Sequence, residues 1–125
     1  MTENSSTEES MTTATTGSRV GRLMTMKAHP GRGNELAAAL LTVAIGLREF
    51  PGCEIYLINQ DQTSPDIVYV VEVWADEASA NAALEAARAA TSTAVSITDV
   101  LAMLGDEPQR IDVVPHGGVG LADAG

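Results

Sequence analysis

The chain has 125 residues, of which 17 are acidic and 7 basic, so its formal net charge is −10 at pH 7. This length predicts a single domain, and so acidic a surface repels phosphate backbones and anionic lipid, which disfavours nucleic acid and membranes as partners. The single cysteine, Cys53, excludes an intramolecular disulfide and has no zinc ligand set around it. No apolar run is long enough to span a membrane and no signal pattern opens the chain, so we expect a cytoplasmic protein.

Both ends of the chain differ in composition from its middle. Residues 1–18 are mostly Thr, Ser, Glu and Asn without periodic apolar positions, which predicts a disordered N-terminal tail. Residues 116–125 are rich in glycine, which predicts a flexible C-terminal tail. The folded domain is therefore expected to occupy residues 19–115.

The first expected elements are a strand over residues 19–28 and a helix between two Pro-Gly pairs, Pro30-Gly31 and Pro51-Gly52. Asn34 is expected to cap the helix, which should run to about Glu49. The strand should turn one alternate set of side chains toward the helices: Val20, Arg22, Met24, Met26 and Ala28. The helix carries an apolar stripe in steps of four and three: Leu36, Leu40, Val43, Leu47 and Phe50.

The second half of the domain begins with a predicted hairpin. Strands are expected over residues 53–59 and 67–74, joined by a polar loop. The second of these strands is apolar on both faces, so both faces should be covered, one by helices and the other by a partner subunit.

A second helix should follow, with Asp76 as its cap and residues 77–90 as its body. Its inward residues are mainly alanines with Leu84, so it should either sit close to the sheet or leave space beneath it. A capping box that begins at Ser96 predicts a short third helix, and residues 110–114 read as a last strand.

The resulting order is strand, helix, strand, strand, helix, helix, strand, which is typical of the ferredoxin-like split βαβ arrangement. We therefore predict an α+β fold with a four-stranded antiparallel sheet and helices on one face. The other face, with Tyr69, Val71 and Val73 among its candidates, would be bare in a monomer. An apolar face of that extent usually marks an interface, so the sequence predicts a homodimer.

Glu72 and Trp74 are the most informative polar and aromatic residues. They lie two apart on one strand and therefore share a face, and Arg22 is the nearest candidate partner for the carboxylate. They could form a site, or a structural ion pair beside a core tryptophan. Tyr56, Met24 and Met26 could line the same space or belong to an ordinary core. The two histidines, His29 and His116, are expected in solvated loops.

Three segments, taken in order, resemble the antibiotic biosynthesis monooxygenase family. They are Met26 to Gly31 with its Pro-Gly strand exit, Phe50 to Cys53 at the helix boundary, and Val71 to Ala78 with its Glu-Val-Trp strand end. The resemblance implies a dimeric α/β barrel in which two ferredoxin-like sheets pack face to face. It also implies a pocket between sheet and helices in each subunit, and for some members oxygenation of quinols or anthrones without metal or flavin.

Haem-degrading relatives carry a pocket asparagine, a tryptophan and a haem-ligating histidine. This chain keeps the tryptophan as Trp74, but the asparagine position holds Met24, and the histidine position falls at Ala83 or Leu84. We therefore expect no haem and no other cofactor.

Two hypotheses follow. In the first, the protein is a cofactor-independent monooxygenase acting on a small phenolic, quinol or polyketide-type substrate, with Glu72 and Trp74 as catalytic candidates. The substrate would lie against the remaining site residues: Arg22, Met24, Met26, Tyr56 and Leu84. In the second, the same fold is a non-catalytic module, without turnover, that binds a small molecule or has an accessory or stress-response role.

Overall fold

The computed structural model describes residues 18–89 and 97–121 of the chain. The order of elements confirms the order expected from the sequence. The elements in these ranges are β2 (Val20–Lys27), α1 (Gly33–Gly46), β3 (Cys53–Gln60), β4 (Ile67–Trp74), α2 (Glu77–Ala89), α3 (Ile97–Ala102) and β5 (Gln109–Val113).

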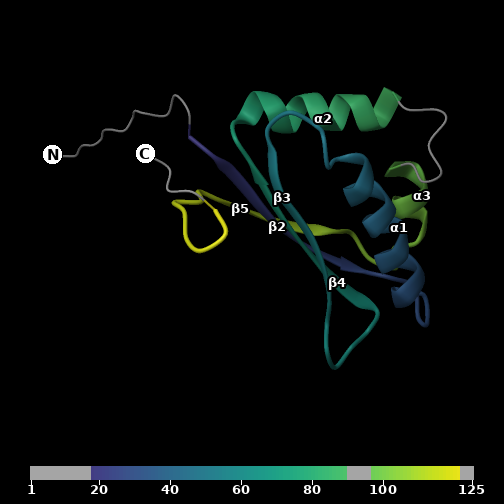
Figure 1. Cartoon of the computed structure of the whole chain (residues 1–125). Helices are drawn as coiled ribbons and strands as arrows, with labels where there is room; N and C mark the ends of the chain where they lie inside the picture. Colours follow the sequence, from purple (N-terminus) through teal and green to yellow (C-terminus); the bar gives the residue numbers. More distant parts are fainter. Residues whose placement is uncertain (1–17, 90–96, 122–125) are drawn as a thin grey trace, which may run out of the picture.

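The four strands form one antiparallel sheet in the order β3-β4-β2-β5. All three helices lie on the same side of this sheet, as Figure 1 shows. The predicted ferredoxin-like α+β fold is thus confirmed. The two central strands pair so that Arg22 lies directly opposite Glu72, and β5 joins the free edge of β2.

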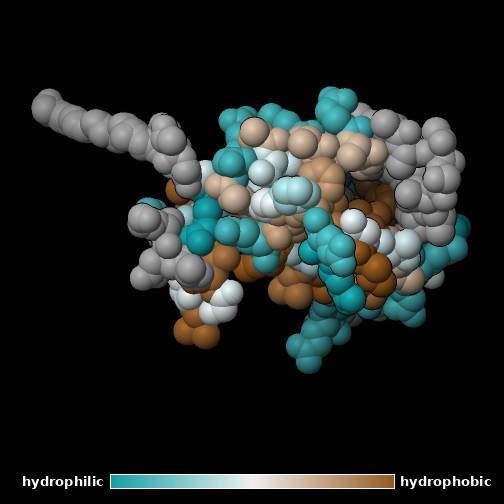
Figure 2. All heavy atoms as spheres, turned by 45° about the horizontal axis from the view of Figure 1, so that its top comes forward, coloured by the Kyte–Doolittle hydropathy of each residue, from teal (hydrophilic) through white to brown (hydrophobic). Residues whose placement is uncertain are grey.

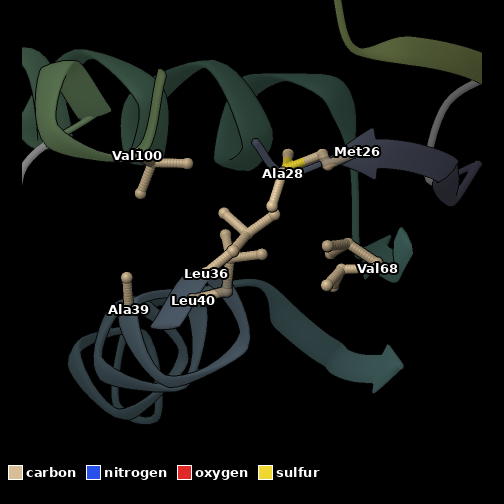
Figure 3. Close-up of a cluster of buried hydrophobic side chains, with 8 residues drawn as sticks. Met26, Ala28, Leu36, Ala39, Leu40, Val68 and Val100 are labelled. Carbon is tan, nitrogen blue, oxygen red and sulfur yellow. The ribbon is translucent and has the colours of Figure 1, made fainter. Parts of the chain in front are cut away.

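The main core lies between the sheet and the helices α1 and α3 (Figure 3). Leu36 and Leu40 come from the predicted stripe of α1, and both are buried against β2 and β4. Val100 of α3 closes this cluster from the other side. The alternation expected for the first strand is also correct, because Met26 and Ala28 are buried toward the helices while Leu23 on the opposite face is exposed.

The N-terminus of α1 is capped in a different way from the expected one. The helix begins at Gly33, and the residue before it, Arg32, makes no side-chain capping bond. Instead, the carboxylate of Asp66 accepts hydrogen bonds from the backbone N–H groups of Gly31 and Gly33, at 3.0 and 2.9 Å. Asn34 accepts a bond from Gln60. A residue from the β3–β4 loop therefore satisfies backbone donors that a local cap would otherwise serve.

The helix ends differ slightly from the predicted ones. α1 ends at Gly46, because the chain then tightens into three-residue turns in which Leu47 N–H donates to Ala44 and Phe50 N–H to Leu47. The cap of α2 is confirmed, since Asp76 accepts a 2.8 Å bond from Ser79 N–H. The predicted capping residue Ser96 and both predicted tails, apart from residues 18 and 116–121, lie outside the described residues.

Gly33 is the position in α1 where a side chain fits worst. A Cβ added there would lie 1.9 Å from the carbonyl oxygen of Pro65, whereas one at Gly46 in the same helix would meet nothing within 4 Å. Gly33→Ala is therefore expected to lower the free energy of unfolding by about 1–3 kcal/mol or more. Gly46→Ala should leave it unchanged or raise it by up to about 1 kcal/mol. Urea unfolding of both variants checks this, and equal midpoints would contradict it.

The side of the sheet that carries no helix is apolar in its central rows. The strand register places Leu57, Val71, Leu23 and Ile111 in one line across all four strands. Leu23, Leu57 and Ile111 are exposed, as is the predicted face residue Tyr69, whereas Val73 on the same face is already buried. None of the helices in the described ranges combines the length and apolar character needed to cross a membrane.

Candidate functional site

A cavity of about 260 Å³ lies between the helix-facing side of the sheet and the helices. In the space-filling view, hydrophobic atoms are visible beside the pale ridge of the alanine-rich helix α2 (Figure 2). The lining residues come from every helix and every strand: Arg22, Met24, Met26, Leu40, Val43, Leu47, Tyr56, Glu72, Trp74, Ala80, Ala83, Leu84, Ala87, Val100, Leu101, Pro108 and Arg110.

The structure brings all the sequence-predicted site residues to this one cavity. Period-two alternation places them on the helix-facing side of three neighbouring strands, and α2 supplies the remaining one. They are Arg22, Met24, Met26, Tyr56, Glu72, Trp74 and Leu84. Their location is thus established, while their roles in binding or catalysis remain proposals.

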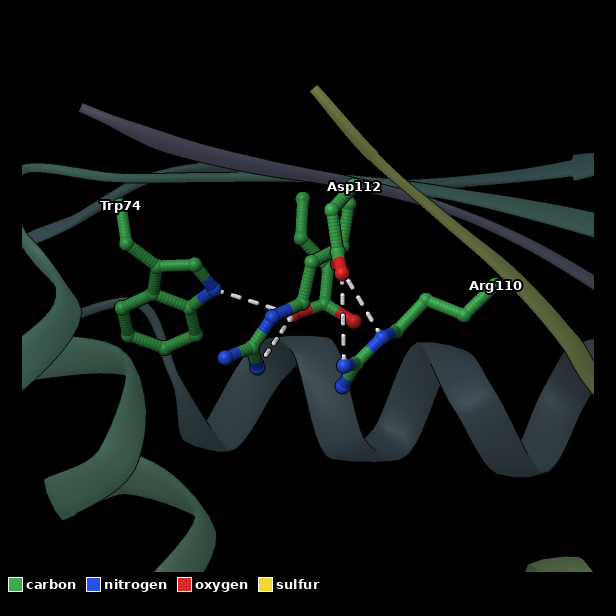
Figure 4. Close-up of polar contacts among 5 residues, drawn as sticks. Trp74, Arg110 and Asp112 are labelled. Atoms are coloured by element: carbon green, nitrogen blue, oxygen red, sulfur yellow. Dashed lines mark hydrogen bonds and ion pairs between the residues drawn. The ribbon is translucent and has the colours of Figure 1, made fainter. Parts of the chain in front are cut away.

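Glu72 is the buried polar centre of the cavity wall, with 7% of its surface exposed. Its Oε1 atom accepts a 3.0 Å hydrogen bond from the indole Nε1–H of Trp74, shown in Figure 4. The same oxygen lies 4.0 Å from Nη1 of Arg22 on the facing strand. No hydrogen bond to the second oxygen, Oε2, is found among the described residues. Within the part of the chain that the structure describes, Glu72 therefore has one anchored oxygen and one without a hydrogen-bond partner.

Tyr56 lies directly across from Glu72 on β3. Burial raises the pKa of its hydroxyl, and the nearby Glu72 carboxylate raises it further. The hydroxyl makes no hydrogen bond to another described residue. Tyr56 thus stays protonated at neutral pH and offers an O–H donor at the wall of the cavity.

Trp74 is held from two sides. Its ring meets Phe50 edge to face, with centroids 6.3 Å apart, and it packs with Ala80 and Ala83 of α2. Its indole N–H is committed to Glu72. The ring is therefore fixed in position, which suits a flat wall for an aromatic ligand.

The small residues of α2 leave space instead of closing it. Ala80, Ala83 and Ala87 all line the cavity, and Ala80 and Ala83 are buried. The alanine-rich sequence left open whether α2 packs closely on the sheet or leaves space beneath it. The structure favours space beneath the helix, because the cavity lies there.

Sequence reasoning missed Arg110. It lies on β5, across from Met24 of β2, and the same alternation that turns Met24 inward brings Arg110 to the cavity. Its Nε is 3.1 Å from Oδ1 of Asp112, and both side chains are more than half exposed. The available signal was the strand order of the ferredoxin-like fold, which places the last strand beside the first.

The positions that carry the pocket asparagine and the haem-ligating histidine in the haem-degrading relatives hold other residues here. Met24, Ala83 and Leu84 all line the cavity, and none can donate a nitrogen to iron. Neither histidine is among the lining residues, and His29 is exposed in its turn. Within the described residues no cluster of three metal-ligating side chains occurs.

These features define a class of protein: a ferredoxin-like α+β domain with a mostly apolar cavity between sheet and helices. Residues 19–91 match the family described as antibiotic biosynthesis monooxygenase. The match spans more than half of the chain, and the chain belongs to this family.

Solved structures agree with this assignment. The chain is similar to a proposed antibiotic biosynthesis monooxygenase from Chloroflexus aurantiacus, with 31% identity, a TM-score of 0.62, and coverage of 81% of this chain and 96% of that one. A second protein of the same description, from Bacteroides thetaiotaomicron, shares 23% identity at a TM-score of 0.65, covering 78% and 90% of the two chains. A conserved protein of unknown function from the same organism, described as a possible oxidoreductase, shares 12% identity at 0.66, covering 79% and 99%. The last two support the fold alone. Among curated proteins, none matches the sequence significantly.

Proposed function

We propose that this protein is a cofactor-independent monooxygenase that oxidises a small phenolic, quinol or polyketide-type substrate with molecular oxygen. The observation that carries the proposal is the Glu72 carboxylate, which is buried in an apolar cavity and keeps Oε2 free of other described groups. Membership of the monooxygenase family supports the same reading.

In this mechanism the substrate ring lies against Trp74, and Oε2 of Glu72 removes a proton from it. The guanidinium of Arg22 faces the negative charge that develops, and the O–H of Tyr56 supplies a further donor. The substrate anion then gives electrons to oxygen, and a carbon–oxygen bond forms. When a CH₂ group is oxidised, the O–O bond breaks, one oxygen stays in a new carbonyl, and the other leaves as water with both hydrogens. The substrate thus supplies all the electrons, and the protein supplies orientation and desolvation.

We further propose that the protein works as a cytoplasmic homodimer. The exposed apolar row across the open sheet face supports self-association, because a contiguous apolar surface of this kind is unfavourable in water. The cavity lies on the helix side of the sheet, so such a dimer would leave it accessible.

A binding or accessory module without turnover is the second candidate. The observation that favours it is the lining itself: none of the described lining residues is a histidine, and most of them are apolar. Such a cavity can hold a hydrophobic ligand without reacting with it.

Oxygen uptake separates the two candidates. Purified protein is incubated aerobically with a panel of one- and two-ring hydroquinones, and dissolved oxygen is followed with an electrode. We expect uptake above the buffer rate for at least one substrate, proportional to protein concentration and lost after heat denaturation. Uptake no faster than with heat-denatured protein, for substrates that demonstrably bind, would favour the binding module.

A further inference from the structure

The cavity contains more positive charge than the acidic chain as a whole would predict. Two of the seven basic residues, Arg22 and Arg110, line it, and Glu72 is the one acidic residue among the described lining groups. The other lining side chains are uncharged. An otherwise acidic molecule therefore concentrates guanidinium groups at one apolar cavity.

The two arginines are close enough to act on one ligand. Arg22 lies opposite Asp112 in the pairing of β2 and β5, so Arg110 is its diagonal neighbour on the same face. Diagonal positions on adjacent strands are separated by about 7–8 Å, which long side chains can bridge.

Among the described residues, neither guanidinium has partners for all of its N–H donors. Arg22 has a side chain only 16% exposed, yet its one ion pair among the described residues is the 4.0 Å contact with Glu72. That length is beyond a hydrogen bond, so the donors of a mostly buried guanidinium remain available. Arg110 uses Nε and Nη2 on Asp112, at 3.1 and 3.5 Å, and both partners are more than half exposed. Such an exposed pair is weak, and a ligand anion can compete with Asp112 for Arg110.

The size of the cavity limits the rest of the ligand. An apolar cavity of about 150 Å³ is enough to hold benzene. At about 260 Å³, this one suits one ring or two fused rings. Trp74 and the methionines Met24 and Met26 provide the apolar contact surface.

We propose that the cavity selects a one- or two-ring aromatic ligand carrying a single negative charge, with its anionic group held between Arg22 and Arg110. This proposal rests on the proposed function only because it concerns the same cavity. It names the substrate class as an aromatic acid or another aromatic molecule with a single negative charge. Asp112 acts as the competitor that the ligand anion displaces from Arg110. A planar carboxylate matches the fork of a guanidinium, which is why this group is preferred over a neutral amide.

Calorimetric titration without turnover tests the proposal. The probes are 2-naphthoate and its neutral isostere 2-naphthamide, which differ little in shape but by one charge. We expect naphthoate to bind about tenfold more tightly, a factor typical of one charge-assisted hydrogen bond. Arg110→Gln should remove that preference by weakening naphthoate alone. Asp112→Asn should strengthen naphthoate binding, because it removes the competing carboxylate.

Arg48→Gln is the matched control, since Arg48 is exposed and does not line the cavity. It changes the net charge by the same amount as Arg110→Gln and should leave both affinities unchanged. Any one of three results would overturn the proposal. Naphthamide binds as tightly as naphthoate, naphthoate does not bind at millimolar concentration, or Arg110→Gln and Arg48→Gln change naphthoate binding equally. A preference for naphthoate over naphthamide without oxygen uptake would reject the monooxygenase and support the anionic ligand. Oxygen uptake without this preference would support the monooxygenase and reject the anionic ligand.

Discussion

Glu72→Gln is expected to lower the rate of oxygen uptake per folded molecule by a factor of about 10² to 10⁴, the range for losing a positioned general base. An amide of the same shape still accepts the 3.0 Å hydrogen bond from Trp74, but it cannot take a proton from the substrate.

Glu54→Gln is the matched control for this experiment. Glu54 is also a strand carboxylate paired with an arginine, at 2.7 Å from Nε of Arg19, but it does not line the cavity. Its substitution should leave the rate per folded molecule unchanged. Melting temperatures of both variants separate lost stability from lost chemistry. If Glu72→Gln loses stability while ligand affinity and rate per folded molecule stay at wild-type values, Glu72 has only a structural role. Its proposed role as the general base is then wrong.

Trp74→Phe tests the role of the Glu72 carboxylate through its hydrogen-bond partner. The change removes the indole N–H that anchors Oε1 of Glu72 and keeps an aromatic ring in the wall. As a companion to Glu72→Gln, it should weaken ligand binding and lower the rate of oxygen uptake by a smaller factor, because the carboxylate itself is still present. This pattern differs from the one expected for loss of the base itself.

The elements of the fold could be predicted because the hydrophobic pattern changes sharply at their ends. β4 spans Ile67–Trp74 as expected, since an unbroken apolar run there lies between a polar loop and the cap Asp76. Local signals could not predict the cap of α1, because its carboxylate comes from Asp66, 33 residues from Gly33. A bond of that kind depends on the packed positions of a loop and a helix, and no short window of sequence contains both.

The candidate site was predictable to the extent that it follows from strand alternation. Glu72 and Trp74 share a face by spacing alone, and the central position of β2 and β4 places Arg22 opposite Glu72. Arg110 was not predicted, because its approach to the cavity depends on the register between β5 and β2. The free volume was also beyond the sequence, since an alanine-rich helix is equally compatible with close packing and with a cavity.

Leu23→Lys is expected to convert the proposed dimer into a monomer. Leu23 lies on β2, one of the two central strands, and it is 40% exposed on the face without helices. Its neighbours in the row across the sheet, Val71 and Ile111, are apolar as well. In a two-fold symmetric pair of sheets each substitution is present twice, so two lysine charges would be buried against apolar side chains.

Leu23 is exposed in the single chain, so a lysine there reaches water and leaves the monomer fold intact. A change in the sedimenting mass therefore reports lost association and not unfolding. Leu41→Lys is the matched control, since Leu41 is exposed on α1, which lies on the helix side of the sheet. Sedimentation equilibrium at micromolar concentration should give twice the chain mass of 13.0 kDa for the wild type and the control. It should give the single-chain mass for Leu23→Lys, with an unchanged far-UV circular dichroism spectrum. Face-to-face sheets would bury roughly 2,000 Å² or more, an area typical of obligate homodimers. A wild-type protein that sediments as a monomer under these conditions would therefore show that the open face serves another purpose.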